Sequence, residues 1–235
     1  MKEKHNLVVN GSGNPSGGVY NKVKIRGEGT ISDHIDCTSF KTHGSSSVEG
    51  NVKTNIFDVF GEAEVRGALH AESSSVYGNL EVYGDAAVKK AKVRGMMHAH
   101  QKLTSEAVDV KGSLLVQGNV EVEQFVSDGS FEINGMLNVG TIQVGIRYDN
   151  STADEIGGEK ITARRKFSFL PFTKKESFLV ARIIEGDEID LEYTKAQLVR
   201  GNKVRIGPGC EIELVEYHEG YQNTSQSVVK EYKKI

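Results

Sequence analysis

Glycine recurs every 17 residues through the first half of this 235-residue chain. A fixed short period is the signature of a stacked-repeat architecture, and it constrains the fold more than any local propensity does. A second column, six residues further on, is also mostly glycine and runs from Asp33 to Gly135. Both columns predict corners, where the chain bends and a side chain would clash. The first column consists of Gly27, Gly44, Gly61, Gly78, Gly95, Gly112 and Gly129.

Between these corners, polarity alternates with a period of two. Two columns at the 17-residue spacing hold only apolar residues, and the residues between them are mostly polar. Alternation of this kind indicates strands rather than helices, and strands in register across repeats stack on one another. We therefore predict an all-β fold, a single-stranded parallel β-helix with about 17 residues per coil. The two apolar columns are Ile31, Val48, Val65, Val82, Ala99, Val116 and Ile133, and Ile35, Val52, Leu69, Ala86, Leu103, Val120 and Leu137.

The predicted coil is narrow. Seventeen residues at about 3.3 Å each give a perimeter of roughly 56 Å, enough for three short sides. We expect the interior to hold Val, Ile, Leu and Ala but few large rings. The aromatic content of 7% and the absence of Trp agree with this expectation.

Composition excludes several function classes. The net charge of −3 gives no electrostatic reason to expect nucleic-acid binding. Two cysteines, Cys37 and Cys210, make no disulfide framework, and Cys37 falls in an inward column. The glycine-rich stretch Gly11–Gly18 lacks the Gly-Lys-Ser/Thr ending of a phosphate-binding loop. We see no secretory signal peptide and no run of 18 apolar residues, and we therefore expect a cytoplasmic location.

Changes in pattern divide the chain into five segments. Regular coils continue to residue 145, and strand-like alternation resumes after a segment that breaks the register. We predict a flexible lead-in (1–18), seven regular coils (19–145), a basic and aromatic insert (146–177), a continuation of the β-helix (178–217) and a polar tail (218–235).

The insert concentrates three phenylalanines between two basic clusters. Basic residues beside exposed aromatics are attracted to an anionic membrane surface or to a partner groove. The alternative is a loop that folds its aromatics back over the solenoid, or a disordered excursion. The candidate docking residues are Arg164, Arg165, Lys166, Phe167, Phe169, Phe172, Lys174 and Lys175.

Two histidines stand out among the outward columns. His98 and His100 lie two residues apart on one strand face, and the register places Glu81 and Tyr83 beside them on the preceding coil, so that Glu81 could complete a triad. Such a triad could hold Zn or Ni. Surface histidines without a ligand are the simpler interpretation, and we predict no metal, no cofactor and no catalytic residue.

Short motifs recur in both halves of the chain. In the N-terminal half they are Val48–Val52 (VEGNV), Val65–Leu69 (VRGAL), Leu80–Gly84 (LEVYG) and Gln117–Val120 (QGNV). In the C-terminal half they are Ile184–Ile189 (IEGDEI), Arg200–Gly201 and Val204–Ile212 (VRIGPGCEI). The first set resembles the repeats of the bactofilins, the polymer-forming bacterial cytoskeletal proteins, and the second resembles the longer bactofilin-like proteins of Gram-positive spore formers. The similarity extends over about residues 21–217.

The resemblance implies a right-handed β-helix that polymerises end to end without nucleotide. It also implies a scaffold for envelope or motility (flagellar) assembly. This chain departs from the short family form by its insert and its second solenoid piece. The departure leaves open which coil makes the C-terminal contact, and whether filaments or small assemblies form.

The ends of a β-helix favour self-association for a physical reason independent of any family. A terminal coil exposes unpaired backbone groups and core side chains, and such an edge templates pairing unless it is covered. We predict that at least one end binds another copy of the chain. Further expected partners are the inner membrane surface and envelope or flagellar assembly proteins. The candidate self-association residues are Val19, Val23 and Ile25 in the first coil, and Val204, Ile206, Ile212 and Leu214 in the last.

Two enzyme classes compete with a non-enzymatic scaffold. Hexapeptide-repeat acyltransferases are also short-period β-helices, and His98 or His100 would be the catalytic residue. Their three equal hexads do not match a period of 17. Polysaccharide lyases and hydrolases have longer coils with aligned acids in a groove, and neither feature is present in the pattern. We therefore favour the scaffold.

Overall fold

The computed structural model describes residues 4–147, 149–166 and 176–235. The chain is all-β and forms a parallel β-solenoid with about 17 residues per coil, as predicted. It divides into two units, Met1–Gly118 and Asn119–Ile235, each of which is described by itself. Among the described residues, no helix is long and apolar enough to cross a membrane.

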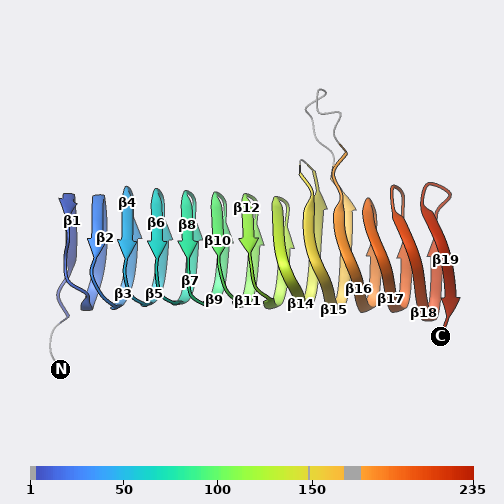
Figure 1. Ribbon diagram of the computed structural model, residues 1–235, viewed down its shortest axis with the longest axis horizontal. Coiled ribbons are helices and arrows are strands. Elements are labelled where there is room, and N and C mark those ends of the chain that lie inside the picture. The colour runs from blue at the N-terminus through green and yellow to red at the C-terminus, as the bar shows by residue number, and fades with distance from the viewer. Residues whose placement is uncertain (1–3, 148, 167–175) are drawn as a thin grey trace. The chain divides into compact units, whose positions relative to one another are not determined.

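The first unit repeats two strands per coil, one of eight residues and one of four. Paired residues on successive long strands are 17 positions apart, as in Ile35↔Val52 and Val52↔Leu69. Figure 1 shows the short strands β4, β6, β8, β10 and β12 as a parallel row. The strands are β1 (Leu7–Gly13), β2 (Gly18–Ile31), β3 (Ile35–Thr42), β4 (Ser45–Val48), β5 (Val52–Val59), β6 (Glu62–Val65), β7 (Leu69–Val76), β8 (Asn79–Val82), β9 (Ala86–Val93), β10 (Met96–Ala99), β11 (Leu103–Val110) and β12 (Ser113–Val116).

The first glycine column is required by the close approach of successive coils. A Cβ at Gly44 would lie 2.1 Å from the carbonyl oxygen of Gly27, and a Cβ at Gly78 would lie 1.9 Å from that of Gly61. These four glycines have no positive φ angle. Space, rather than an unusual backbone conformation, therefore excludes any side chain at this corner.

At the second corner, polar side chains support the backbone of the next coil. The Asn51 side-chain oxygen accepts a hydrogen bond from the N–H of Ala68 at 2.8 Å, and Asp85 accepts one from Lys102 at 3.3 Å. These contacts satisfy amides that the strand ladder leaves unpaired where the chain turns.

A third corner lies inside each eight-residue strand, and glycine does not mark it. In β5 the inward–outward alternation slips at Asn55 and Ile56, which are both exposed. Each coil therefore has three straight segments, in agreement with the predicted three sides. An ordinary polar or apolar residue suffices here because nothing crowds the outside of this bend.

The core is the pair of predicted columns and their neighbours. Every residue of both columns is buried, with at most 2% of its surface exposed. Cys37 is also buried, and burial raises the pKa of its thiol. The inward assignment made from the sequence is confirmed.

Among the described residues the core holds few large rings, as expected, and these are phenylalanines. Phe40, Phe57, Phe125 and Phe131 are all buried. The rings of Phe40 and Phe57 lie on neighbouring coils and stack with their centroids 4.9 Å apart. The coil spacing of about 4.8 Å is close to the spacing of stacked rings, so that a column can hold one ring per coil.

The second unit keeps the stacking but varies the coil length. The spacing between paired residues is 17 for Val120↔Leu137, 19 for Met136↔Glu155 and 15 for Leu179↔Thr194. Its strands are all parallel to their neighbours within the unit. They are β13 (Val120–Ser127), β14 (Ser130–Ile146), β15 (Ser151–Arg165), β16 (Leu179–Leu191), β17 (Thr194–Ile206), β18 (Glu211–Asn223) and β19 (Val228–Lys234).

Three of the predicted segment boundaries differ from the structure. The lead-in contains β1, the insert contains β15, and the tail contains β19 together with the end of β18. Strand β1 is spaced 16 residues from β2, with Leu7 opposite Val23, and is therefore out of phase with the 17-residue pattern. A search for a fixed period misses strands whose connections are longer or shorter than the repeat.

Candidate functional site

The predicted N-terminal association residues lie inside the stack. Strand β1 covers β2, with Leu7 opposite Val23 and Val9 opposite Ile25. Val23 and Ile25 are therefore buried, while Val19 remains 59% exposed. The predicted association residues lie on β2, whereas the first strand of the stack is β1.

The same correction applies at the C-terminal side. Strand β18 covers β17, and β19 in turn covers β18. Val204, Ile206 and Ile212 are buried, and Leu214 is partly buried. In the described part of the chain, the first unit therefore has a free strand edge at β1. The second unit has one at β19 and at the second half of β18 (residues 218–223), which β19 does not reach.

The edge of β1 is uncharged. Its seven residues, LVVNGSG, carry no charged side chain and pair with β2 along their whole length. Val8 is 52% exposed, whereas Val9 points inward and is 8% exposed. In Figure 1, β1 is the outermost strand of its unit, and no described strand of that unit lies against its other side.

The edge of β19 is strongly charged. Its sequence, VVKEYKK, includes Lys230 and Lys233, which pair with Glu213 at 2.9 Å and Glu216 at 2.7 Å on β18. Lysines along an edge are one of the devices by which natural sheets avoid pairing with other chains. The edge of β1 has no such protection.

Tyrosine rings gather on the last two strands. The rings of Tyr217 and Tyr221 are 5.4 Å apart, and those of Tyr221 and Tyr232 are 4.9 Å apart. Burial raises the pKa of Tyr221. Tyr232 lies opposite the buried Val215 and is itself 60% exposed.

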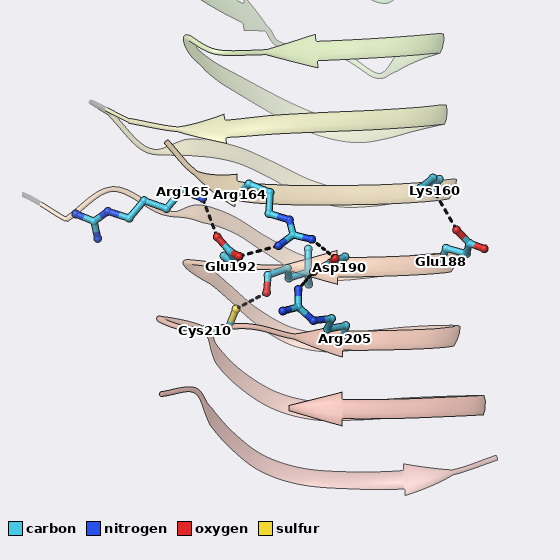
Figure 2. Close-up of polar contacts among 9 residues, drawn as sticks. Lys160, Arg164, Arg165, Glu188, Asp190, Glu192, Arg205 and Cys210 are labelled. Atoms are coloured by element: carbon cyan, nitrogen blue, oxygen red, sulfur yellow. Dashed lines mark hydrogen bonds and ion pairs between the residues drawn. The ribbon is translucent and has the colours of Figure 1, made fainter. Parts of the chain in front are cut away.

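Two basic residues of the predicted docking segment are paired with acidic side chains. Arg164 lies between Asp190 and Glu192 in Figure 2, 2.9 Å from Glu192, and Lys166 pairs with Asp128. Arg165 differs, since its backbone N–H donates to Glu192 at 3.1 Å while its guanidinium lies 4.3 Å from the centre of the Tyr193 ring. The ion pairs neutralise the charges of Arg164 and Lys166, which would otherwise attract an anionic membrane.

The rest of the docking prediction lies outside the described residues. It comprises Phe167, Phe169, Phe172, Lys174 and Lys175.

The acidic partners of Arg164 belong to a network that spans several coils. Asp190 also binds Arg205 at 2.9 Å, and Lys160 binds Glu188 at 3.0 Å (Figure 2). Cys210 lies beside this network and donates to the carbonyl oxygen of Leu191 at 3.4 Å. Burial raises the pKa of the Cys210 thiol to about 11, which keeps it protonated and unreactive at neutral pH.

The structure brings Glu81, His98 and His100 together, as their register predicts. Glu81 on β8 lies opposite His98 on β10. The Glu81 carboxylate is 2.7 Å from His100 Nε2 and 3.7 Å from His98 Nδ1. The hydrogen bond with His100 is the main cause that lowers the pKa of Glu81.

Side chains that the sequence analysis did not assign to the cluster hold its rings in place. Tyr83, the neighbour of Glu81 on its coil, stacks on His100 with ring centroids 4.4 Å apart, and the Arg66 guanidinium lies 4.5 Å from the centre of Tyr83. Gln117 Nε2 lies 3.3 Å from His98 Nε2. Arg66 and Gln117 share the outward column of Tyr83 and His100 at the 17-residue spacing, so this column could have identified them.

The chain belongs to the same family as YhbE of Bacillus subtilis (strain 168), an uncharacterized protein. The two are 50% identical over 217 residues, which cover 92% of each chain. The uncharacterized protein YhbF of the same organism is 45% identical over 101 residues, covering 43% of this chain and 42% of YhbF. No family model matches the chain, and no solved structure is significantly similar to it.

Proposed function

We propose that this protein is a non-enzymatic, bactofilin-like scaffold that binds other copies of itself through strand edges and without nucleotide. The observation that carries the proposal is the uncharged, unprotected edge of β1. Strand β1 of a second copy of the chain could pair with this edge and continue the sheet, since a free strand presents a row of unpaired backbone donors and acceptors. The charged β19 edge is the weaker contact in this proposal.

The cellular role that we propose follows from the resemblance to bactofilins. The scaffold supports envelope or motility (flagellar) assembly from the cytoplasm, at the inner face of the membrane. Its partners are other copies of the chain and envelope or flagellar assembly proteins. The ion pairs of Arg164 and Lys166 favour a protein partner over direct binding to anionic lipid.

A matched pair of double variants tests the edge contact. Val8→Lys with Asn10→Lys places two positive charges on exposed positions of the β1 edge. Asn55→Lys with Ile56→Lys places the same charges on exposed positions of β5, which has a strand on each side. Sedimentation velocity should show assemblies for the native chain and the β5 variant, and mainly monomer for the β1 variant. A monomeric native chain at high concentration would refute the proposal, as would undiminished assembly of the β1 variant.

An acyltransferase remains the second candidate, and one observation favours it. His100 is held by the Glu81 carboxylate at 2.7 Å, an arrangement that can orient an imidazole as a general base. An acyl-CoA turnover assay with the native chain and His100→Gln separates the two candidates. Turnover that is lost in the variant supports the enzyme, and absence of turnover with a panel of acceptors supports the scaffold.

A further inference from the structure

We propose that Glu81, His98 and His100 form a binding site for one zinc-class divalent cation, linking two neighbouring coils of the first unit. The inference is independent of the proposed scaffold function. It concerns side chains on the outer face of the solenoid and requires no second copy of the chain.

The two histidines face the same way because of the strand that carries them. They flank Ala99, which is fully buried, so the imidazoles of His98 on β10 and of His100 directly after its end both lie on the outer face. The third ligand comes from the neighbouring coil, where Glu81 is directly opposite His98. Two imidazoles and one carboxylate are a ligand set that zinc uses in proteins, with a fourth position open to water.

The distances suit a single small cation. The three ligand atoms all lie within 4.8 Å of one another. Zinc binds nitrogen and oxygen ligands at about 2.0–2.2 Å, so two ligands on one tetrahedral ion are about 3.3 Å apart. The separations of Glu81 from His100 (2.7 Å) and from His98 (3.7 Å) bracket that value. The two imidazole rings stack with their centroids 3.9 Å apart, so side-chain rotation has to converge the three ligand atoms on the ion.

The surroundings of the cluster favour a cation. A groove of about 560 Å³ is lined by Glu81 and His98 and also by Glu28, Glu62 and Glu64. Its lining residues include no lysine or arginine, but Arg66 outside the groove pairs with Glu64 at 2.7 Å, so Glu28, Glu62 and Glu81 supply its net negative charge. A concave surface with charges of one sign raises the local concentration of the opposite ion.

Neighbouring side chains supply the support that metal ligands need. Tyr83 stacks on His100, and the Gln117 amide lies within hydrogen-bond distance of His98. Partners of this kind fix the orientation of a ligating ring. All three ligands are partly exposed, with 21–40% of each side chain accessible, so a cation can enter without opening the fold.

The ligand chemistry selects among the common divalent ions. Imidazole nitrogen suits Zn²⁺, Ni²⁺ and Cu²⁺, whereas Mg²⁺ and Ca²⁺ prefer oxygen ligands alone. We therefore expect zinc to bind with a stoichiometry of one per chain, and magnesium and calcium to bind weakly.

Isothermal titration of the full, EDTA-treated chain with zinc chloride tests the site. The native chain should bind one equivalent. His100→Gln and Glu81→Gln should each weaken binding by about tenfold or more, since loss even of a group that only supports a ligand costs about 10- to 100-fold. His70→Ala is the matched control, because His70 is an exposed strand histidine outside the cluster and its loss should leave binding unchanged.

Cobalt absorption provides a second measurement. Co²⁺ bound at the site should give the visible bands of a four-coordinate ion in the native chain and in His70→Ala, and His98→Gln should lose them. Circular dichroism checks that each variant keeps its β structure, as expected for partly exposed positions. The proposal is overturned if the native chain binds no zinc, or if folded Glu81→Gln and His100→Gln bind zinc as tightly as the native chain.

Discussion

The two units reach the same parallel stacking with different regularity. From β2 onward the first unit uses a constant 17-residue coil whose corner glycines touch the backbone of the preceding coil. The second unit has coil spacings that change from one coil to the next, yet a Cβ at Gly186 would still lie 2.3 Å from the carbonyl oxygen of Gly158. Close approach at glycines therefore acts in both units. In the second unit, ion pairs across most neighbouring strands add to it.

Ion pairs connect most neighbouring strands of the second unit. They include Lys160–Glu188 at 3.0 Å and Lys195–Glu211 at 2.9 Å. Glu216 is only 7% exposed and has two cationic partners, Arg200 at 2.6 Å and Lys233 at 2.7 Å. Opposite charges on directly paired strands stabilise one register and oppose a shift.

The largest expected effect is at a corner glycine of the first unit. Gly78→Ala should destabilise the fold by about 3–5 kcal/mol, because its Cβ would lie 1.9 Å from a backbone oxygen that cannot move without shifting a coil. Chemical denaturation measures the free energy of unfolding. Gly220→Ala in the second unit is the control, since nothing lies within 4 Å of its added Cβ, and we expect a change within about 1 kcal/mol. Equal effects at the two positions would show that close approach does not set the register of the first unit.

The next largest effect concerns the buried ring stack. Phe57→Ala removes a fully buried ring that stacks on Phe40, and should cost about 3–4 kcal/mol. Phe60→Ala removes a ring from the outer face of the same coil, where it is 46% exposed, and should cost about 1 kcal/mol. Thermal or chemical denaturation of both variants compares them. If Phe57→Ala costs no more than Phe60→Ala, the stacked rings contribute little to the stability of the first unit.

A smaller effect is expected from the ion pairs of the second unit. Glu216→Gln should cost about 1–2 kcal/mol, because the carboxylate is buried while both of its cationic partners are partly exposed. Glu72→Gln in the first unit breaks an exposed pair with Lys89 and should cost less than about 0.5 kcal/mol. Chemical denaturation at low and at high salt measures the free energy of unfolding of both variants, since salt weakens an exposed ion pair more than a buried one. If the two losses are the same, side-chain pairing does not distinguish the second unit from the first.

The smallest effect is a dependence on pH. Lys233 and Arg200 lower the pKa of Glu216 below its unfolded value of about 4.3, so the folded chain binds the proton less readily than the unfolded chain. This stabilisation is present above the unfolded pKa and is lost as the pH falls through the folded pKa. The difference in stability between the native chain and Glu216→Gln should therefore shrink from about pH 5 downward. A difference that stays constant down to the acid limit of the fold would contradict this assignment.

The sequence predicted the first unit well because one geometric solution is repeated. Seven apolar residues at the 17-residue spacing, among them Val48 and Val65, identify the inward face of the strands. The same spacing places Glu81 beside His98 and His100. The register of the second unit could not be found in this way. Its spacing between paired residues ranges from 15 to 28 over described strands, as Leu179↔Thr194 and Ser151↔Leu179 show.

By itself, the sequence determined the strand period, the inward columns and the glycine corners, because each depends only on local alternation and on a repeat that every coil obeys. Only the tertiary structure decided which strands are the free edges, that phenylalanine rings stack within the core, and which acids hold Arg164 and Arg200. These features depend on which segment lies against which. Which segments pack together is decided by contacts between residues that are separated in the sequence by varying distances, so no repeat in the sequence predicts them.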